Sequence, residues 1–530
     1  LVACGGDSDT PDEQAAGTAA TGTGGTTAAE TPKPGGTLRE ATITQAPHFS
    51  PYHPGADPSY VNTWRRVNGY YDALWTFREV DVPDRLVLRA AASVEQPDPA
   101  TYVVKLHPAR FHNRPPANGG EVTAEDVAAV VQFLSKPPAS GGSFLQSGKD
   151  LKAVTAIDAQ TARFETFGPR AFFYEEGVGV PTTGRIIVPK EMLDEKTLKE
   201  QIPAGSGPYQ YKSHTQGSIE EVTRFDGYRL QGRPYITEKK LTFVPDTASI
   251  EAAFRSGQID WMGFTDVRQR DAVLRDLGTK VQSETYPSTS GMALLVNVFR
   301  PPWNDPRVRE AIYRAIDVDR VLNVVFFGDG GRTWYFSPAN FDRFPIPWEQ
   351  VEPQVGYDPK KAADLLKAAG VDLNKEYEFM VPVEAQTWVD SGRLMAEDLA
   401  AVGLKTRINP VVRNIYLQRA GPEPGDFDIS MSVLLDYRHA STDAGTFWNS
   451  TALNDAEIDA LIGKINETVD VEARSKLSEE FQTMLARKHS NLIPLLTTNV
   501  HNGWYARLKG FNEEFRKFSG WQDDRWIDGG

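Results

Sequence analysis

The chain has 530 residues and a formal net charge of −14, and its 40% hydrophobic and 24% charged residues are typical of a globular protein with a sizeable core. The acidic balance argues against a nucleic-acid partner, which a basic face would bind. No run of about 20 apolar residues occurs, so the sequence predicts no membrane-spanning helix.

The first 34 residues combine a lone cysteine with a low-complexity run. Cys4 is the only cysteine, and Leu1-Val2-Ala3-Cys4 resembles a bacterial lipobox, where cleavage leaves a lipidated N-terminal cysteine; a chance match is the alternative. Residues 5–34 contain no Val, Ile, Leu, Phe, Tyr or Trp, so they cannot bury enough apolar surface to fold. We therefore expect a disordered tether that follows a lipid anchor on Cys4.

Strand and helix patterns alternate through the first half of the chain. Alternating apolar residues predict strands, and apolar residues at helical spacing predict helices. The clearest helix start is Thr123, an N-cap residue followed by Glu125 and Asp126 and then by apolar residues. The expected elements are strands at 35–43, 101–106 and 153–167 (a pair), a strand pair after 205–209, and helices at 123–134 and 250–255.

The pattern changes after about residue 275. A new strand is expected at 291–298, and a long helix from Asp305 to about Phe326. A helix at 359–370 ends on Gly370, a residue that commonly closes helices. Residues 455–485 form an almost continuous helix pattern, after which 491–495 returns to strand.

The sequence carries none of the motifs that would identify a secreted hydrolase or a metalloprotein. It has no H-E-x-x-H, no G-x-S-x-G, no paired C-x-x-C and no calcium loop. Its eight histidines lack the i, i+4 helical pairing of a zinc site. We therefore expect no metal, no cofactor and no catalysis. Because convergent triads leave no fixed motif, a secreted hydrolase stays the alternative of a different class.

Several motifs, read in order, resemble those of one family. They include Gly35–Leu38, Thr101–Leu106, Val122–Val127, Gly205–Tyr209, Ser256–Asp260, Asp305–Ala311 and Tyr357–Pro359. Each motif is weak alone, but their order and spacing over residues 35–526 are similar to solute-binding family 5, the oligopeptide- and dipeptide-binding proteins of ABC importers. Departures at 89–95 and 111–120 weaken any transfer of contacts from that region.

This resemblance implies an α/β fold, namely the two-lobed periplasmic-binding-protein fold (type II, cluster C-like) with an extra inserted subdomain and a disordered N-terminal tether. The lobes would close about a hinge onto a ligand. The implied division is a lipobox and tether at 1–34, lobe I at 35–275 with the inserted subdomain at about 60–195, lobe II at 276–489, and a return to lobe I at 490–530.

The resemblance also implies a ligand site. The segment Ser432–Tyr437 is similar to the strand that pairs with a bound peptide, and Asp436 to the acid that receives its amino terminus. Such an ion pair contributes about 4 kcal/mol before desolvation at about 4 Å and an effective dielectric near 20. Asp443 is the rival acid, and Asp436 could instead cap a turn. The other candidate ligand-binding residues are Leu435, Tyr437, Arg438, Trp448, Tyr52, His53, and Arg332 and Trp334 in the loop 328–338.

The implied function is that of an extracytoplasmic substrate-binding lipoprotein of an ABC importer. The protein would capture di- to oligopeptides as a monomer and deliver them to separate permease and ATPase subunits. It would be held at the cell membrane, in the periplasm or at the cell surface, through its N-terminal lipid. An oligosaccharide, an opine or a metal chelate is the alternative ligand within this class, and a ligand sensor for a membrane receptor is a further possibility.

Overall fold

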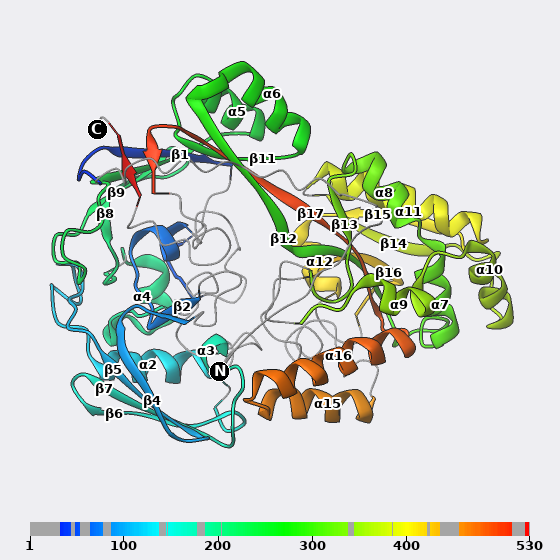
Figure 1. Cartoon of the computed structure of the whole chain (residues 1–530), viewed down its shortest axis with the longest axis horizontal. Helices are drawn as coiled ribbons and strands as arrows, with labels where there is room; N and C mark the ends of the chain where they lie inside the picture. Colours follow the sequence, from blue (N-terminus) through cyan, green and yellow to red (C-terminus); the bar gives the residue numbers. More distant parts are fainter. Residues whose placement is uncertain are drawn as a thin grey trace, which may run out of the picture.

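A computed structural model describes residues 32–43, 48–52, 64–77, 86–136, 145, 147–176, 186–202, 204–337, 344–383, 385–420, 425–434, 455–510 and 525–528. These residues form an α/β protein with two lobes, which are connected through long strands (Figure 1). Among the helices in these ranges, none combines the length and the apolarity needed to cross a membrane.

The first sheet has the strand order β1-β10-β9-β8. In β1 the burial alternates along the strand, as its apolar pattern predicts, and β1 lies parallel to β10. The two predicted strands after residue 205 are β8 and β9, which form an antiparallel pair. The bounds are Thr37–Thr42 (β1), Tyr209–Thr215 (β8), Ile219–Arg224 (β9) and Glu238–Phe243 (β10).

A second four-stranded sheet, of order β4-β5-β7-β6, is antiparallel throughout and packs against α2. The predicted cap of α2 is confirmed, since the Thr123 side chain accepts a hydrogen bond from the backbone of Asp126, and the Asp126 side chain accepts one from the backbone of Thr123. The bounds are Ala91–Asp98 (β4), Thr101–Leu106 (β5), Ala124–Leu134 (α2), Leu151–Asp158 (β6) and Thr161–Thr166 (β7).

Smaller elements fill the space between these two sheets. They are a π-helix at Trp64–Gly69, the strand pair β2 (Trp75–Phe77) and β3 (Leu86–Leu88), α3 (Phe173–Glu176), a 3₁₀ turn at Lys190–Met192 and α4 (Glu195–Glu200). One contiguous cluster of buried side chains joins both sheets and includes Val104, Phe164, Phe173, Val222 and Leu241. We call this cluster the lobe I core.

The third sheet has seven strands, in the order β11-β17-β12-β16-β14-β15, and β13 also pairs with β17. Its two longest strands, β12 and β17, run side by side from β11 to β16 (Figure 1). The bounds are Trp261–Phe264 (β11), Val281–Val296 (β12), Gly330–Arg332 (β13), Tyr377–Pro382 (β14), Thr406–Val411 (β15), Ile429–Leu434 (β16) and Leu492–Tyr505 (β17).

Helices pack around this sheet, and those from α7 onwards share with it a second buried cluster, the lobe II core, which includes Leu294, Ile312, Met395, Ile465 and Phe481. The helices α5 and α6 pack instead on β11 and the start of β12, in a separate cluster that includes Phe254, Phe264 and Val273. The bounds are Thr247–Arg255 (α5), Val267–Leu277 (α6), Pro306–Ala315 (α7), Val318–Val325 (α8), Trp348–Val355 (α9), Pro359–Ala368 (α10), Gln386–Ala401 (α11), Arg413–Ala420 (α12), Ala456–Glu467 (α15) and Val471–Arg487 (α16). A 3₁₀ turn at Gly278–Lys280 follows α6, and β18 (Leu508–Lys509) pairs with β19 (Trp526–Ile527).

Two predicted helices are each divided in the structure. The helix expected from Asp305 to Phe326 breaks at Ile316, because Asp317 caps a new helix and accepts a hydrogen bond from the backbone N–H of Arg320. The helix pattern at 455–485 breaks in the same way at Asp470, whose carboxylate accepts from the backbone of Ala473. In both cases an aspartate that suits a helix surface serves instead as a helix start.

The strand predicted at 291–298 is also longer than expected, since β12 begins at Val281 and ends at Val296. Its first half is rich in polar residues and includes Pro287, which is why the apolar pattern did not reveal it. Trp504 near the end of β17 and Leu508 just after it pack with Leu38 of β1, so this part of the chain contacts the first sheet again. The residue numbers at which one lobe gives way to the next stay predictions.

Candidate ligand-binding site

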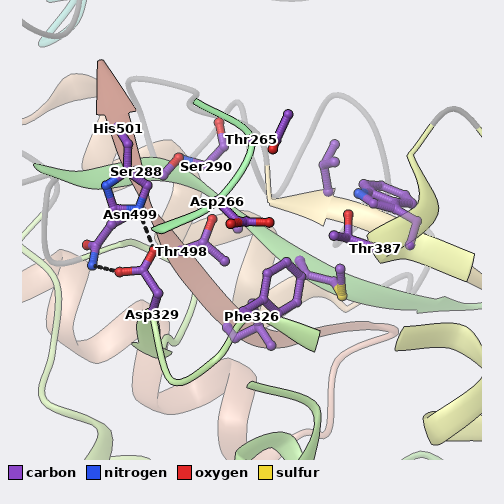
Figure 2. A pocket seen from close by; sticks show the side chains of 15 residues that line it. Thr265, Asp266, Ser288, Ser290, Phe326, Asp329, Thr387, Thr498, Asn499 and His501 are labelled. Carbon is purple, nitrogen blue, oxygen red and sulfur yellow. Dashed lines mark hydrogen bonds and ion pairs between the residues drawn. The ribbon is translucent and has the colours of Figure 1, made fainter. Parts of the chain in front are cut away.

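A cavity of about 300 Å³ lies where β12 and β17 pass between the two lobes (Figure 2). This volume is at the lower end of the range for small-molecule sites. Its walls come from both halves of the chain, including the start of α6, the start of α11 and the end of β16. The lining residues are Thr265, Asp266, Ser288, Ser290, Gly291, Met292, Phe326, Asp329, Thr387, Trp388, Val433, Leu496, Thr498, Asn499 and His501.

An irregularity in the pairing of β12 with β17 forms part of the wall. The register shifts between Pro287 and Gly291, and Ser288 and Ser290 lie within this bulge. The Thr497 hydroxyl donates to the carbonyl oxygens of both serines, at 2.9 and 2.8 Å. Hydrogen bonds from β17 therefore hold the bulge in place. The bulge interrupts the strand pair at the cavity, as bulges often do next to functional sites.

His501 anchors the polar wall of the cavity. Its Nε2 lies 2.6 Å from Oδ2 of Asp329, and Asn499 donates to the other oxygen of the same carboxylate at 2.7 Å (Figure 2). On the far side of the ring, Nδ1 lies 2.8 Å from the Thr285 hydroxyl and 3.2 Å from the Arg270 guanidinium. Because a guanidinium only donates and a carboxylate only accepts, Nδ1 is placed to accept a hydrogen bond and Nε2 to donate one.

Thr285, His501 and Asp329 are hydrogen-bonded in the same sequence as the nucleophile, the base and the orienting acid of a catalytic triad. However, Thr285 does not line the cavity, and its hydroxyl accepts a hydrogen bond from Arg270 at 2.8 Å. The three residues therefore present no nucleophile to a molecule in the cavity. What they do is tie α6 and β12 to the loop that carries Asp329.

Asp266 contributes a carboxylate to the cavity from the start of α6 (Figure 2). Its Oδ1 accepts from the backbone N–H groups of Arg268 and Gln269 at 2.8 and 2.9 Å. Burial acts to raise the pKa of Asp266, but these N–H groups and the Arg268 charge together lower it below its usual value. The carboxylate is therefore ionised at neutral pH.

The opposite wall is apolar and comes from Met292, Phe326, Trp388, Val433 and Leu496. A cavity with one polar and one apolar wall can orient a small molecule that has both kinds of surface. Within the described ranges, no three His, Cys, Asp or Glu side chains gather closely enough to hold a metal ion.

Several residues predicted to form the site lie outside the described residues, namely His53, Leu435, Asp436, Tyr437, Arg438, Asp443 and Trp448, and so does Cys4, the predicted site of lipidation. The strand β16, which leads directly into this segment, is described as far as Leu434. Its residue Val433 lines the cavity, three positions before Asp436. The roles of these residues stay predictions.

The other three predicted residues are described, and none of them lines this cavity. Arg332 forms a bidentate pair with Asp319 at 2.9 and 3.0 Å. Trp334 is 2% exposed in the lobe II core and donates from Nε1 to a backbone carbonyl. Tyr52 is 7% exposed and donates its hydroxyl proton to the Ile186 carbonyl at 2.5 Å. In the structure, all three therefore make contacts within the protein.

The sequence analysis missed the residues of the polar wall, although three of them left a signal. Asp329 lies in the loop that was singled out through Arg332. His501 and Asn499 alternate with Val500 in the polar continuation of the last strand, beyond the apolar run that was recognised. Asp266 shows only the spacing of a helix cap, and Trp388 carried no signal of its own.

A cavity at the junction of two α/β lobes connected by long strands defines a two-lobed binding protein. Residues 85–455 match the family described as bacterial extracellular solute-binding proteins, family 5 Middle. The chain therefore belongs to the family 5 solute-binding proteins, as the motif order predicted.

Individual relatives are distant. The peptide transport periplasmic protein SapA of Salmonella typhimurium is 23% identical over 424 residues, which cover 74% of each chain. The oligopeptide-binding protein AppA of Bacillus subtilis, solved with a nonapeptide, has a TM-score of 0.75 at 20% identity and covers 94% of this chain and 100% of its own. AgaA of A. tumefaciens R10, solved with agropinic acid, has a TM-score of 0.76 at 21% identity, with 93% and 99% covered. The two structures establish the two-lobed fold.

Proposed function

We propose that this chain is the extracytoplasmic substrate-binding lipoprotein of an ABC importer, and that it captures peptides between its lobes and delivers them to a membrane permease. The observation that carries this proposal is the cavity at the β12–β17 bulge. Its walls combine Thr265 and Asp266, which the predicted division assigns to lobe I, with residues of β16 and α11, which it assigns to lobe II. A ligand there would contact both lobes at once and would favour their closure. The bulge between Pro287 and Gly291 is the proposed hinge.

A peptide is the proposed ligand because it can pair with a strand. Val433 lies at the cavity near the end of β16, and strand addition there would bind a peptide backbone without selecting its side chains. Asp436, three positions after Val433 in the sequence, is the proposed partner of the peptide ammonium group. SapA is named for peptide transport and AppA was solved with a nonapeptide, which supports this choice. AgaA was solved with agropinic acid, so an opine is the alternative ligand.

The test is native mass spectrometry of the purified protein, followed by denaturation and identification of the released small molecules. A mixture of short peptides with varied side chains is expected. In Asp436→Ala the affinity for such peptides should fall at least about 30-fold, because the ligand's buried ammonium group loses its partner. Asp443→Ala is the matched control and should bind normally.

Two outcomes would each contradict one part of the proposal, namely the ligand class or the residue that binds the ammonium group. Release of one defined sugar, opine or chelate refutes the peptide ligand and keeps the transport role. Normal binding by Asp436→Ala with loss in Asp443→Ala moves the ammonium site to the rival acid. Lipidation is tested separately, because a labelled fatty acid should be incorporated into the exported protein and not into its Cys4→Ala variant.

A further inference from the structure

Two consecutive phenylalanines belong to different cores. Phe173 is 1% exposed and lies in the lobe I core, whereas Phe172 is 6% exposed and lies in the lobe II core. Among the described residues, Phe172 is the one fully buried member of the lobe II core that precedes Met292 in the sequence. Its burial therefore depends on contact between segments that the chain places far apart.

Phe172 extends from a segment that is firmly attached to lobe I. The ring of Phe173 stacks on that of Tyr102, with 3.6 Å between centroids and 2° between planes. Arg170 pairs with Asp150 at 3.0 Å, and its carbonyl oxygen accepts a hydrogen bond from the Tyr102 hydroxyl at 3.2 Å. The backbone that carries Phe172 is thus fixed to the β4–β7 sheet.

On the other side, Phe172 lies against Arg474 in the first turn of α16. The guanidinium carbon of Arg474 lies 5.3 Å from the centre of the Phe172 ring. The same guanidinium donates to the carbonyl oxygens of Thr468 and Val469 at 2.9 Å each. Next to Phe172, the backbone N–H of Ala171 donates to the carbonyl of Asn466 at 2.8 Å. An apolar side chain and a backbone hydrogen bond therefore join the lobes here.

This contact lies apart from the strands that connect the lobes. Figure 1 shows α3 beside α15 and α16 at the lower side of the molecule, whereas β11, α5 and α6 lie at the upper side, where β12 and β17 reach lobe I. A rotation about the β12–β17 bulge would separate α3 from α15 and α16. Phe172 would then lose its apolar surroundings and become exposed to water.

We propose that Phe172 is a clasp, which buries its ring in lobe II when the lobes are closed and releases it when they open. The proposal rests on the proposed function, since it assumes closure about the hinge. Burial of a phenylalanine side chain favours the closed state about 10- to 100-fold. Phe172 would thereby set how long a captured solute is held.

The experiment measures the distance between spin labels on the two lobes in the full chain without ligand. Lys105→Cys and Glu472→Cys place the labels on exposed positions of the two lobes, in a Cys4→Ser background. Phe172→Ala should shift the population towards longer distances by 10-fold or more, and Phe172→Leu by less. Phe167→Ala, at an exposed position just after β7, is the matched control and should change nothing.

A second measurement follows ligand release. The same variants should release a bound peptide faster, in the order Phe172→Ala, Phe172→Leu, wild type. Unchanged distances in both Phe172 variants would overturn the clasp, and so would equal release rates. Because the distance measurement needs no ligand, a shift in Phe172→Ala without any peptide binding by wild type would uphold the clasp and refute the proposed ligand.

Discussion

Replacement of Glu220 by glutamine should strongly destabilise lobe I. Glu220 is fully buried on β9 and accepts hydrogen bonds from the Arg65 guanidinium at 2.5 to 3.1 Å and from the Tyr70 hydroxyl at 2.6 Å. Arg65 is itself only 3% exposed. Glu220→Gln therefore leaves a buried positive charge without its counter-ion, which costs about 3–5 kcal/mol.

The ionisation of Glu220 gives a second route to this magnitude. Burial acts to raise its pKa, but His214 and Arg65 together lower it from 4.5 to about 2. This difference corresponds to about 3 kcal/mol of stability at neutral pH. For a unit of 150–250 residues, a loss of about 3 kcal/mol lowers the melting temperature by roughly 6–12 °C.

The pH dependence distinguishes this mechanism from simple loss of packing. Because the pKa of Glu220 is lower in the folded state, its stabilisation is complete above about pH 4.5 and is lost as the pH falls towards 2. Hydrogen bonding to Glu220 raises the pKa of His214 in the folded protein. The stabilisation from this pair is therefore complete below about pH 6.5 and is lost as the pH rises through the pKa of His214 in the folded state. The stability difference between wild type and Glu220→Gln should therefore be largest between about pH 4.5 and 6.5.

Thermal unfolding followed by circular dichroism between pH 3 and 8 measures this difference. Glu238→Gln on the neighbouring strand is the control, because its pair with Lys212 is partly exposed and contributes at most about 1 kcal/mol. Equal melting temperatures for the two variants would refute the assignment of a buried ion pair. A difference that does not vary with pH would refute its electrostatic origin.

Two further predictions concern the polar wall of the cavity and the pairing of β13 with β17 beside it. His501→Ala removes one hydrogen bond from the Asp329 carboxylate, so it should lower the free energy of unfolding by about 1–3 kcal/mol and weaken ligand binding. His107→Ala, at an exposed position, is the control and should do neither. Equal melting temperatures and equal ligand affinities for the two variants would contradict the role of His501. Gly330→Ala should lower the free energy of unfolding by about 1–3 kcal/mol, because φ of Gly330 is +147° and the new Cβ would lie 2.2 Å from the Thr497 carbonyl oxygen. Gly331→Ala is the control, because a Cβ added there meets no atom within 4 Å. Thermal unfolding compares the pair, and a Gly330→Ala variant as stable as Gly331→Ala would refute the close approach of β13 to β17.

The sequence predicted the ends of helices correctly where residues within a few positions of one another decide where a helix begins or ends. Thr123 lies at the start of α2, because a capping box depends on residues three positions apart. Gly370 adopts a positive φ just after α10, as a residue that closes a helix should. The same local rules failed to divide two predicted helices, since Asp317 and Asp470 fit equally well within a helix or at its N-cap.

The candidate site was less accessible from the sequence. The polar wall combines Asp266, Asp329 and His501, which are separated by 63 and 172 positions. They come together through the pairing of β17 with β11, which precedes Asp266, and with β13, which follows Asp329. None of them belongs to a motif, because their spacing is set by the sheet and not by one helix or turn. Phe172 and Phe173 are equally apolar in the sequence, and nothing local indicates that they enter different cores.

The sequence by itself determined the class of protein, through ordered motifs whose spacing reflects the lengths of strands, helices and turns. It also determined most helix caps and strand faces, because these depend on residues within a few positions of one another. Only the tertiary structure decided which polar side chains share the cavity wall and which phenylalanine crosses between the lobes. Those contacts depend on long-range strand pairing and on the relative placement of two cores, and no short stretch of sequence encodes either.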